Sequence, residues 1–369
     1  MVVFITIPWF SPAYKAGGPI QSIENLIKNF DENITYKIYC GSTDLDGTAL
    51  KNIKLNSWNF YSPNTEVFYS TSASRNIFKT QIEFIKPNII FIIGIFSWHY
   101  NILPIFISTK SKKILSVRGM LHPGALSQKS FKKKVFVGFL KFIGIQNKLN
   151  FHATDEIESG FIKTVFGLNT KVFVANNFSK IYNRNNNLSK VPGELKLITV
   201  ALISPMKNHL LVLKSLKNCE GKIEYTICGP IKDEQYWQLC LNEINTMPKN
   251  ISVSYIGEIN PALIENELSK NHVFIMPSKS ENFGHSISEA LSTGMPVITS
   301  NFTPWNNLQE NNAGINVANN ISSIQNAVDF FANQNQESYY NFRSMTLSYF
   351  EVNNNIEQKK EAYKIMFSS

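Results

Sequence analysis

Short apolar segments recur along the 369-residue chain, and most are separated by ten or more residues with helical spacing. They are VVFITI (2–7), YKIYC (36–40), NIIFII (88–93), KILSV (113–117), KVFVA (171–175), LKLITVA (195–201), IEYTIC (223–228), ISVSYI (251–256), HVFIM (272–276) and PVITS (296–300). Continuous apolar runs of this length are typical of parallel strands that helices cover on both faces. The pattern therefore predicts an α/β protein with doubly wound sheets.

One polar stretch interrupts this pattern near the middle of the chain. FSKIYNRNNNLSKVPGEL, residues 178–195, is rich in Asn and ends in Pro192-Gly193 before a new apolar strand. Because such a stretch is typical of a linker, we expect two Rossmann-like domains, 1–190 and 191–350, with a C-terminal helix at about 351–369 able to pack back onto the first. Ligands bind at the carboxyl ends of parallel strands, so the predicted site is a cleft across which the domains face each other.

Composition excludes several classes of protein. A hydrophobic content of 43% with 17% charged residues is typical of a globular protein. The start, MVVFITIPWF, lacks the basic segment and cleavage site of a signal peptide. The sequence also contains no run of 18 uninterrupted apolar residues, so no membrane-spanning helix is expected. The four cysteines are scattered, which indicates a reducing compartment. We therefore expect a cytoplasmic protein.

The positive charge is concentrated in one part of the chain. The formal net charge is +9, and the interval from Phe84 to Thr154 holds eleven Lys and Arg residues but no Asp or Glu. Within it, SFKKKVFVGFLKFIGIQNKL (130–149) predicts a helix with Lys134, Lys141 and Lys148 on one edge and aromatic residues on the opposite arc. This pattern favours an interfacial helix on an anionic membrane surface, and a core helix with solvated lysines is the alternative. No nucleic-acid motif accompanies the charge, so nucleic acid is not an expected partner.

Two carboxylates flank a Phe-Gly turn in SENFGHSISEAL, residues 280–291. Glu281 follows an apolar strand, and Glu289 lies inside the helix that is predicted to begin after Gly284. At 1.5 Å per residue the two are roughly 10 Å apart along the axis, too far to act as an acid–base pair on one bond. The N–H groups between them attract phosphate at a helix N-terminus. The order of carboxylate, phosphate-binding turn and carboxylate suits a ligand made of a sugar, a diphosphate and a ribose. The alternative is a capped surface helix with two solvated acids.

The longer segment PSKSENFGHSISEALSTGMPVITSNFTPW resembles the signature of retaining glycosyltransferases of family 4, which have the GT-B fold. The matching positions are Glu281, Phe283-Gly284, Glu289-Ala290, Gly294 to Val297 and Pro304-Trp305. The resemblance implies that Glu281 contacts hydroxyls of the donor sugar and that Glu289 binds the ribose of the nucleotide. It also implies a donor-binding turn formed by Asn282, Phe283, Gly284 and His285.

Two further segments resemble donor-binding elements of this family. In SPAYKAGGPIQS (11–22), Gly17 and Gly18 allow backbone to approach a ligand, as in the family's glycine-rich loop that faces the donor diphosphate. VALISPMKNHLLVL (200–213) resembles a turn in which an Arg and, five residues later, a Lys contact the donor phosphates. Lys207 stands at the Lys position, but Leu202 replaces the usual Arg. Arg118 is a candidate for a compensating catalytic cation.

Other motifs bear on pathway and metal. SVRGMLHPGALSQKSFKKK (116–134) resembles a segment of enzymes that build bacterial surface polysaccharides, such as O-antigen and lipopolysaccharide. By the same resemblance, Ile93 stands where the family often carries a histidine, and His99 nearby is a candidate substitute. Asp44-Leu45-Asp46 forms a D-x-D, the metal motif of a different glycosyltransferase fold, but turn chemistry explains it better. We expect no metal and no cofactor, because no His/Cys cluster is present either.

These observations together predict a metal-independent hexosyltransferase. It would move a hexose from a nucleotide diphosphate sugar to a polyprenyl-linked glycan acceptor in surface polysaccharide biosynthesis, peripherally bound at the inner face of the membrane. The alternative is a catalytically impaired relative that still binds the nucleotide sugar, because of Leu202. The base, uridine or guanosine, stays open.

Overall fold

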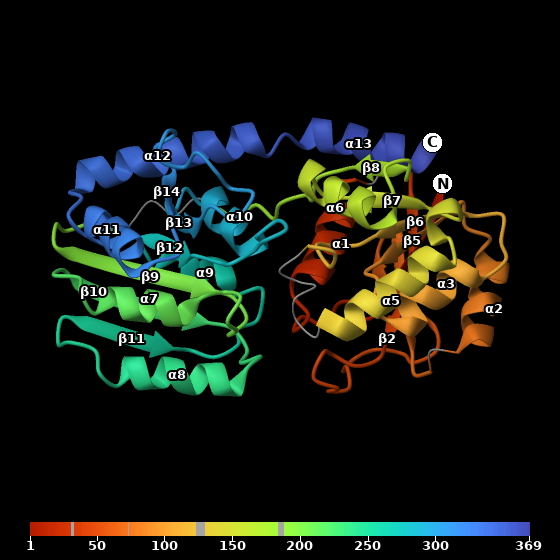
Figure 1. Ribbon diagram of the computed structural model, residues 1–369, viewed down its shortest axis with the longest axis horizontal. Helices are drawn as coiled ribbons and strands as arrows, with labels where there is room; N and C mark the ends of the chain where they lie inside the picture. Colours follow the sequence, from red (N-terminus) through yellow and green to blue (C-terminus); the bar gives the residue numbers. More distant parts are fainter. Residues whose placement is uncertain (31–32, 73, 123–129, 184–187) are drawn as a thin grey trace. The chain divides into compact units, whose positions relative to one another are not determined.

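The computed structural model describes residues 1–30, 33–72, 74–122, 130–183 and 188–369. The chain forms two compact units, one of Met1–Phe178 with Ile356–Ser369 and the other of Ser179–Asn355. Each unit holds one sheet with helices packed against it (Figure 1). The boundary after Phe178 lies at the start of the polar stretch in which the sequence analysis placed its division at 190/191. The segment from Ile356 onward belongs to the first unit.

The sheet of the first unit has the strand order β3-β4-β2-β1-β5-β6-β7-β8. Every neighbouring pair is parallel except β3 and β4, which form an antiparallel hairpin. Its central strands are runs of Val, Ile and Phe that helices bury on both faces. The strands are β1 (Val2–Thr6), β2 (Thr35–Gly41), β3 (Trp58–Ser62), β4 (Thr65–Ser70), β5 (Ile89–Ile93), β6 (Lys112–Ser116), β7 (Asn150–Ala153) and β8 (Val172–Val174).

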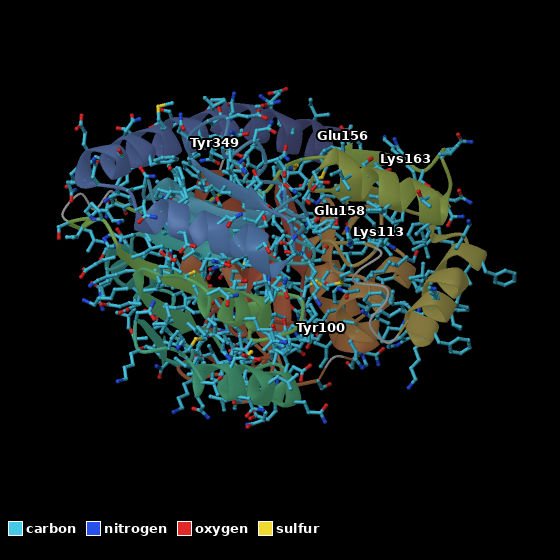
Figure 2. The ribbon with its side chains drawn as sticks, turned by 60° about the vertical axis from the view of Figure 1, so that its left-hand side comes forward. Tyr100, Lys113, Glu156, Glu158, Lys163 and Tyr349 are labelled. Carbon is cyan, nitrogen blue, oxygen red and sulfur yellow. The ribbon has the colours of Figure 1, made fainter. Side chains whose placement is uncertain are left out.

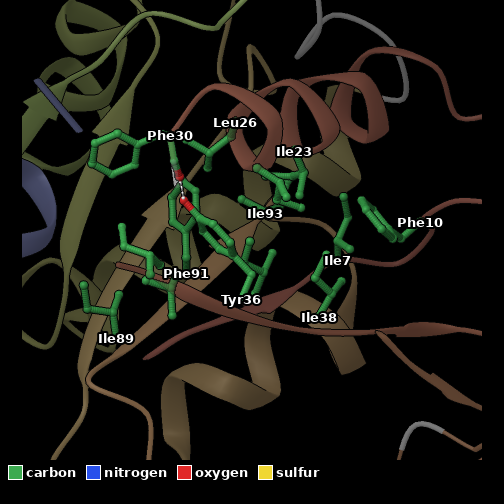
Figure 3. Packing of buried hydrophobic residues seen from close by; sticks show 14 of the residues in the cluster. Ile7, Phe10, Ile23, Leu26, Phe30, Tyr36, Ile38, Ile89, Phe91 and Ile93 are labelled. Carbon is green, nitrogen blue, oxygen red and sulfur yellow. Dashed lines mark hydrogen bonds between the residues drawn. The ribbon is translucent and has the colours of Figure 1, made fainter. Parts of the chain in front are cut away.

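Helices from distant parts of the chain cover the two faces of this sheet. α1 (Gly18–Asn29) and α13 (Ile356–Ser368) share one hydrophobic cluster, part of which Figure 3 shows around Tyr36 and Phe91. The opposite face is covered by α2 (Arg75–Ile85), α3 (Leu103–Phe106), α5 (Ser130–Phe142) and α6 (Glu156–Phe166). Two short helices, η1 (Trp98–Ile102) and η2 (Ile145–Asn147), lie in the connections.

The second unit has a six-stranded, all-parallel sheet in the order β11-β10-β9-β12-β13-β14. Its strands are β9 (Glu194–Val200), β10 (Lys222–Cys228), β11 (Ile251–Tyr255), β12 (Val273–Met276), β13 (Val297–Ser300) and β14 (Gly314–Val317). Its helices are α7 (His209–Leu216), α8 (Glu234–Ile244), α9 (Ile264–Ser269), α10 (His285–Ser292), α11 (Ile321–Ala332) and α12 (Gln336–Asn353). Each sheet is thus doubly wound, as the sequence predicts.

The strand order of each sheet reverses direction at one point. In the first unit it reverses between β1 and β5, and in the second between β9 and β12. Ligands of doubly wound proteins bind in the crevice that such a switch point leaves at the carboxyl ends of the strands. The loops that follow β1, β9 and β12 carry Gly17, Lys207 and Glu281, so the fold brings these sequence-predicted residues to switch points.

The helix predicted at 130–149 is shorter than expected. α5 ends at Phe142, because Gly144 adopts a left-handed conformation with φ 68°, which stops a helix. Lys148 therefore lies outside α5, and its ammonium stands 5.4 Å from the ring centre of Phe106. No helix of the described residues is long and apolar enough to cross a membrane.

Candidate functional site

The loop between β12 and α10 is shaped by a glycine. Gly284 caps α10 with φ 73°, and a Cβ at this position would lie 3.1 Å from Cδ1 of Ile287. Residues with a side chain rarely adopt this conformation, so the Phe-Gly turn of the signature has a backbone cause. The turn directs the N-terminus of α10 toward the carboxyl end of the sheet. The backbone N–H groups of the first helical turn point the same way.

Lys207 and Glu281 form an ion pair at the switch point between β9 and β12. The hydroxyl of Ser278 donates to Oε1 of Glu281 at 3.1 Å, and the backbone N–H of Glu281 donates to the carbonyl of Phe302 at 3.0 Å. The two loops are also tied together by the N–H of Lys279, which donates to the carbonyl of Met206 at 2.9 Å. The carboxylate expected at the sugar and the cation expected at the phosphates are therefore adjacent.

Glu289, in contrast, lies in the interior of the second unit. Its side chain is 1% exposed, and burial raises the pKa of its carboxyl to about 7, while the charge of Lys180 opposes this rise. The same helix packs on the segment that enters the unit, because Ser288 donates to the hydroxyl of Ser179 at 2.7 Å. A buried carboxyl with a pKa near neutrality is a candidate for a functional group.

Trp305 packs against the turn of residues 282–285, which the sequence predicts to bind the donor. Its indole N–H donates to the carbonyl of Phe283 at 2.7 Å, and the two rings meet edge to face at 5.7 Å. The other face of the indole stacks on Phe350 of α12 at 6.5 Å, and Phe283 in turn contacts the His285 ring at 4.8 Å. The Trp of the signature, to which the sequence assigned no role, thus fixes Phe283, the residue between Asn282 and Gly284.

The glycine-rich loop of the first unit leads directly into α1. Gly17 is the N-cap residue of this helix with φ 67°, no heavy atom lies within 4 Å of the Cβ that it lacks, and Gly18 is the first helical residue. The carboxylate of Asp44 accepts hydrogen bonds from the backbone N–H groups of Tyr14 and Lys15. From the sequence we interpreted Asp44, which is part of a D-x-D, as a turn residue. Its contact with the glycine-rich loop was not predicted.

Arg118 points into the interior of the first unit. It is 9% exposed, has φ 51°, donates to Oδ1 of Asn177 and lies over the Phe91 ring at 6.0 Å. The next N–H, of Gly119, donates to Glu158, which α6 carries into the interior (Figure 2). The guanidinium of Arg118 also interacts with the side chain of Tyr363. Its role as a catalytic cation stays a prediction, and residues 123–129 of the same motif lie outside the described residues.

The remaining candidates are placed as follows. Leu202 is half-buried in the loop after β9, and His99 is exposed on η1. Asp44 and Asp46 lie in a turn in which Asp46 pairs with Lys15 at 2.8 Å. Within the described ranges, no group of three or more His, Cys, Asp or Glu side chains is arranged to hold a metal ion.

Residues 183–345 match the family model described as glycosyl transferases group 1. No curated protein matches the sequence significantly. Among solved structures, the whole chain superposes on HepE (Alr3699) from Anabaena in complex with UDP and glucose, with a TM-score of 0.72, 12% identity and 99% of that chain covered. The fold is GT-B. TarM matches with a TM-score of 0.73 at 14% identity over 99% of its chain, and WaaG, a glycosyltransferase involved in lipopolysaccharide biosynthesis, with 0.68 at 11% over all of its chain.

The family match covers most of the second unit of this GT-B protein. It includes the loop that carries Lys207 and the whole segment from Glu281 to Trp305. The signature read from the sequence lies inside the residues that match this model, at the switch point of the sheet.

Proposed function

We propose that this protein transfers a hexose from a nucleotide diphosphate sugar to a lipid-linked glycan acceptor, with retention of the anomeric configuration. The observation that carries the proposal is the meeting of Lys207, Glu281 and the N-terminus of α10 at the switch point of the sheet that matches the group 1 family model. A cation and a helix N-terminus suit a diphosphate, and a neighbouring carboxylate suits sugar hydroxyls. The HepE structures, which hold UDP, glucose or UDP-glucose, support a donor of this class.

The roles of the side chains follow from their surroundings. Lys207 and the first N–H groups of α10 would bind the diphosphate and stabilise the charge that develops as it departs. Glu281, already oriented by Ser278, would hold hydroxyls of the donor sugar. Glu289 would accept hydrogen bonds from the ribose, which favour its charged form against the burial that disfavours it.

By resemblance to family 4, the acceptor attacks from the face that the diphosphate leaves. The departing phosphate oxygen takes the proton of the acceptor hydroxyl, so no enzymic nucleophile is required. Lys207, the Gly17-Gly18 loop and the dipole of α10 are the groups that we assign to the leaving diphosphate in place of a metal. Asn282, Phe283 and His285 complete the donor-binding turn.

A second candidate function rests on one observation. Leu202 stands where the family carries an Arg, and its half-buried aliphatic side chain provides no positive charge. Loss of that cation would weaken stabilisation of the departing diphosphate more than it weakens binding of the donor. The alternative is therefore a catalytically impaired protein that binds the nucleotide sugar.

We assign the acceptor to a membrane on the basis of α5. Phe131, Val135, Phe139 and Phe142 recur at intervals of three and four residues and are exposed, Phe131 by 79% and Phe142 by 88%; we call them the aromatic stripe. Exposed lysines flank it, Lys132 on one side and Lys134 and Lys141 on the other. An apolar stripe between lysines suits an anionic lipid surface.

This surface favours a polyprenyl-linked acceptor at the inner face of the membrane, where the protein would be a peripheral cytoplasmic enzyme. Biosynthesis of a surface polysaccharide, such as O-antigen or lipopolysaccharide, is the pathway that we propose. WaaG, one of the structures that share the fold, is described as acting in lipopolysaccharide biosynthesis, which supports a pathway of this kind.

A thermal-shift panel followed by a turnover assay tests the function. Uridine and guanosine diphosphate sugars are added to the protein, and a ligand that binds the folded state raises the melting temperature according to its concentration over its Kd. The stabilising donor is then incubated with a membrane extract that contains lipid-linked glycans. Sugar transfer supports the enzyme, and stabilisation without transfer supports the impaired alternative. No stabilisation by any nucleotide sugar contradicts both.

A further inference from the structure

The D-x-D of the first unit lies in a turn that its own backbone closes. The N–H of Asp44 donates to the carbonyl of Thr48 at 2.8 Å, and the N–H of Gly47 returns to the carbonyl of Asp44 at 3.0 Å. Gly47 has φ 84°, as a tight turn requires. The carboxylate of Asp44 adds only one bond to this turn, from the N–H of Leu45 at 2.7 Å. The other hydrogen bonds that the Asp44 carboxylate accepts come from outside this turn.

These hydrogen bonds come from the glycine-rich loop, some thirty positions earlier in the chain. Oδ2 of Asp44 accepts from the N–H of Tyr14 at 3.0 Å, and Oδ1 accepts from the N–H of Lys15 at 3.2 Å. The Asp44 side chain is 5% exposed. A buried carboxylate is costly unless hydrogen bonds satisfy it, and those it accepts are about twice as strong as neutral ones. The contact is therefore a firm anchor for the loop.

Besides the ion pair of Lys15 with Asp46, the loop has an anchor at its start and a bond of its own that closes its last turn. The hydroxyl of Tyr69 donates to the carbonyl of Ser11 at 2.5 Å, and the N–H of Gly17 donates to the carbonyl of Tyr14 at 3.0 Å. Asp44 thus fixes Tyr14, whose carbonyl accepts the hydrogen bond that closes the last turn before Gly17. Gly17 has open space at its missing Cβ and begins α1, so the fixed turn determines where the N-terminus of α1 is presented.

We propose that Asp44 is a positioning residue for the donor diphosphate, which it serves by holding the Gly17-Gly18 loop. The inference rests on the proposed function, since it assumes that this loop faces the diphosphate. Both carboxylate oxygens of Asp44 are engaged by N–H groups, and Asp46 is engaged by the ammonium of Lys15 at 2.8 Å. The two acids therefore act on different groups, Asp44 on the loop backbone and Asp46 on the side-chain ammonium of Lys15, unlike a pair that shares one metal ion.

A matched pair of variants separates the two acids. Asp44→Asn replaces one acceptor oxygen by an NH2 group that opposes the loop N–H groups, whereas Asp46→Asn makes the same chemical change on an exposed side chain. We expect Asp44→Asn to raise the KM of the donor about tenfold or more, with a smaller change in kcat, the size expected for a lost bond to a charged group. Asp46→Asn should stay within about twofold of the wild type.

Ligand discrimination distinguishes positioning from a general loss of stability. The Kd values of UDP, GDP, the corresponding monophosphates and inorganic pyrophosphate are measured by calorimetry on the full chain. Asp44→Asn should weaken pyrophosphate and reduce the preference for diphosphate over monophosphate, whereas mere loosening of the fold would leave that preference unchanged. Tyr69→Phe removes the anchor at Ser11 in a milder way and should shift the preference in the same direction.

Each contrary outcome has a defined meaning. A preference for diphosphate that is unchanged in both Asp44→Asn and Tyr69→Phe overturns the positioning role alone. Equal losses in Asp44→Asn and Asp46→Asn, together with activity that depends on added Mn²⁺, overturn it in favour of a metal-binding pair. A wild-type protein that binds neither nucleotides nor pyrophosphate overturns the proposed function and this inference together.

Discussion

Lys207 and Glu281 neutralise each other in a partly buried position, and this shapes what either mutation should do. Removal of Glu281 leaves the Lys207 ammonium without its carboxylate, so a phosphate becomes a better partner for it. We expect Glu281→Ala to abolish turnover while affinity for the nucleoside diphosphate is kept or raised, whereas Glu289→Ala should lower that affinity. Calorimetry with UDP and GDP measures both, with the exposed Glu310→Ala as the control. Equal losses of affinity in the two variants would contradict the assignment.

The buried carboxyl of Glu289 should also make stability depend on pH. Burial raises its pKa from the ordinary 4.5 to about 7, so the folded state holds more protons than the unfolded state between these values. The free energy of unfolding should therefore fall as pH rises from about 4.5 to about 7 and stay level above. Glu289→Gln should remove this part of the fall. Urea unfolding at pH 5 and pH 8 measures it, and the same fall in both proteins would disprove the account.

The missing arginine can be restored. Lys207→Ala should cost about 2 to 4 kcal/mol in transition-state stabilisation, the size seen for one preorganised group, and this sets the scale for the site. Leu202→Arg should raise kcat/KM if the cation was lost without compensation. Leu202→Met is the control, because it keeps a half-buried apolar side chain at this position without adding a charge. An unchanged or lowered rate in Leu202→Arg would show that another cation already serves the diphosphate.

The sequence pointed to the candidate site residues because each one stands in a local pattern. Glu281, Gly284 and Glu289 lie within a single strand-turn-helix unit, and Lys207 follows the strand before α7. The ion pair joins two loops whose residues are 74 positions apart, so it depends on the strand order and could not be read from either pattern. The anchor from Asp44 to Tyr14 was missed for the same reason, because it joins separate loops.

At the scale of elements, α5 carries the proposed membrane contact, and the structure sharpens its test. Lys133 packs over the Phe96 ring at 5.3 Å, so the exposed set is Lys132, Lys134 and Lys141. Each lysine near an anionic leaflet contributes about 1 kcal/mol, so changing all three to Gln should reduce binding to anionic vesicles more than about a hundredfold. Activity on a soluble acceptor analogue should persist. Co-sedimentation at low and high salt measures the binding.

Two controls accompany this prediction. Lys214, Lys222 and Lys249 of the second unit are exposed, and changing them to Gln removes the same charge without touching α5. Phe131→Ser with Phe142→Ser should remove the part of the binding that salt does not weaken. Sedimentation that is undiminished in the α5 lysine variant would rule out the electrostatic contribution. Lost activity on the soluble analogue would show that these lysines serve the fold.

Element prediction succeeded where a strand is buried on both faces and failed at the margins of the sheets. All ten apolar runs form strands. In the part of the chain that the structure describes, the missed strands are β3, β4, β7 and β14. β3 and β4 form an edge hairpin with a mixed polar pattern, and β7 (NFHA) and β14 (GINV) are only four residues long. Their apolar signal is too short or too diluted to separate from a loop.

At the scale of the whole molecule, the chain returns to its first unit after completing the second. Tyr363 of α13 is fully buried, with its ring 5.5 Å from Phe178 and 6.0 Å from Phe30. Tyr363→Ala should lower the unfolding free energy of the first unit by about 3 to 5 kcal/mol, as for other large aromatic side chains in cores. Hydrogen exchange resolved by unit measures this loss.

The control for this variant is Tyr340→Ala, on the exposed side of α12, which should change stability by no more than about 0.5 kcal/mol. Protection in the sheet β9 to β14 should be the same in both variants, because α13 belongs to the cluster of the first unit. A loss spread evenly over both units would show that they unfold as one.

The position of α13 also has a consequence for biosynthesis. A ribosome makes the chain from its amino end, so residues 356–368 emerge only after every strand of the second unit has been translated. Until then, the face of the first sheet around Phe30 and Phe178 lacks the helix that covers it. Nascent domains with uncovered apolar surface are prone to aggregation and are bound by chaperones. The first unit is thus the earlier of the two to be synthesised and the later to be completed.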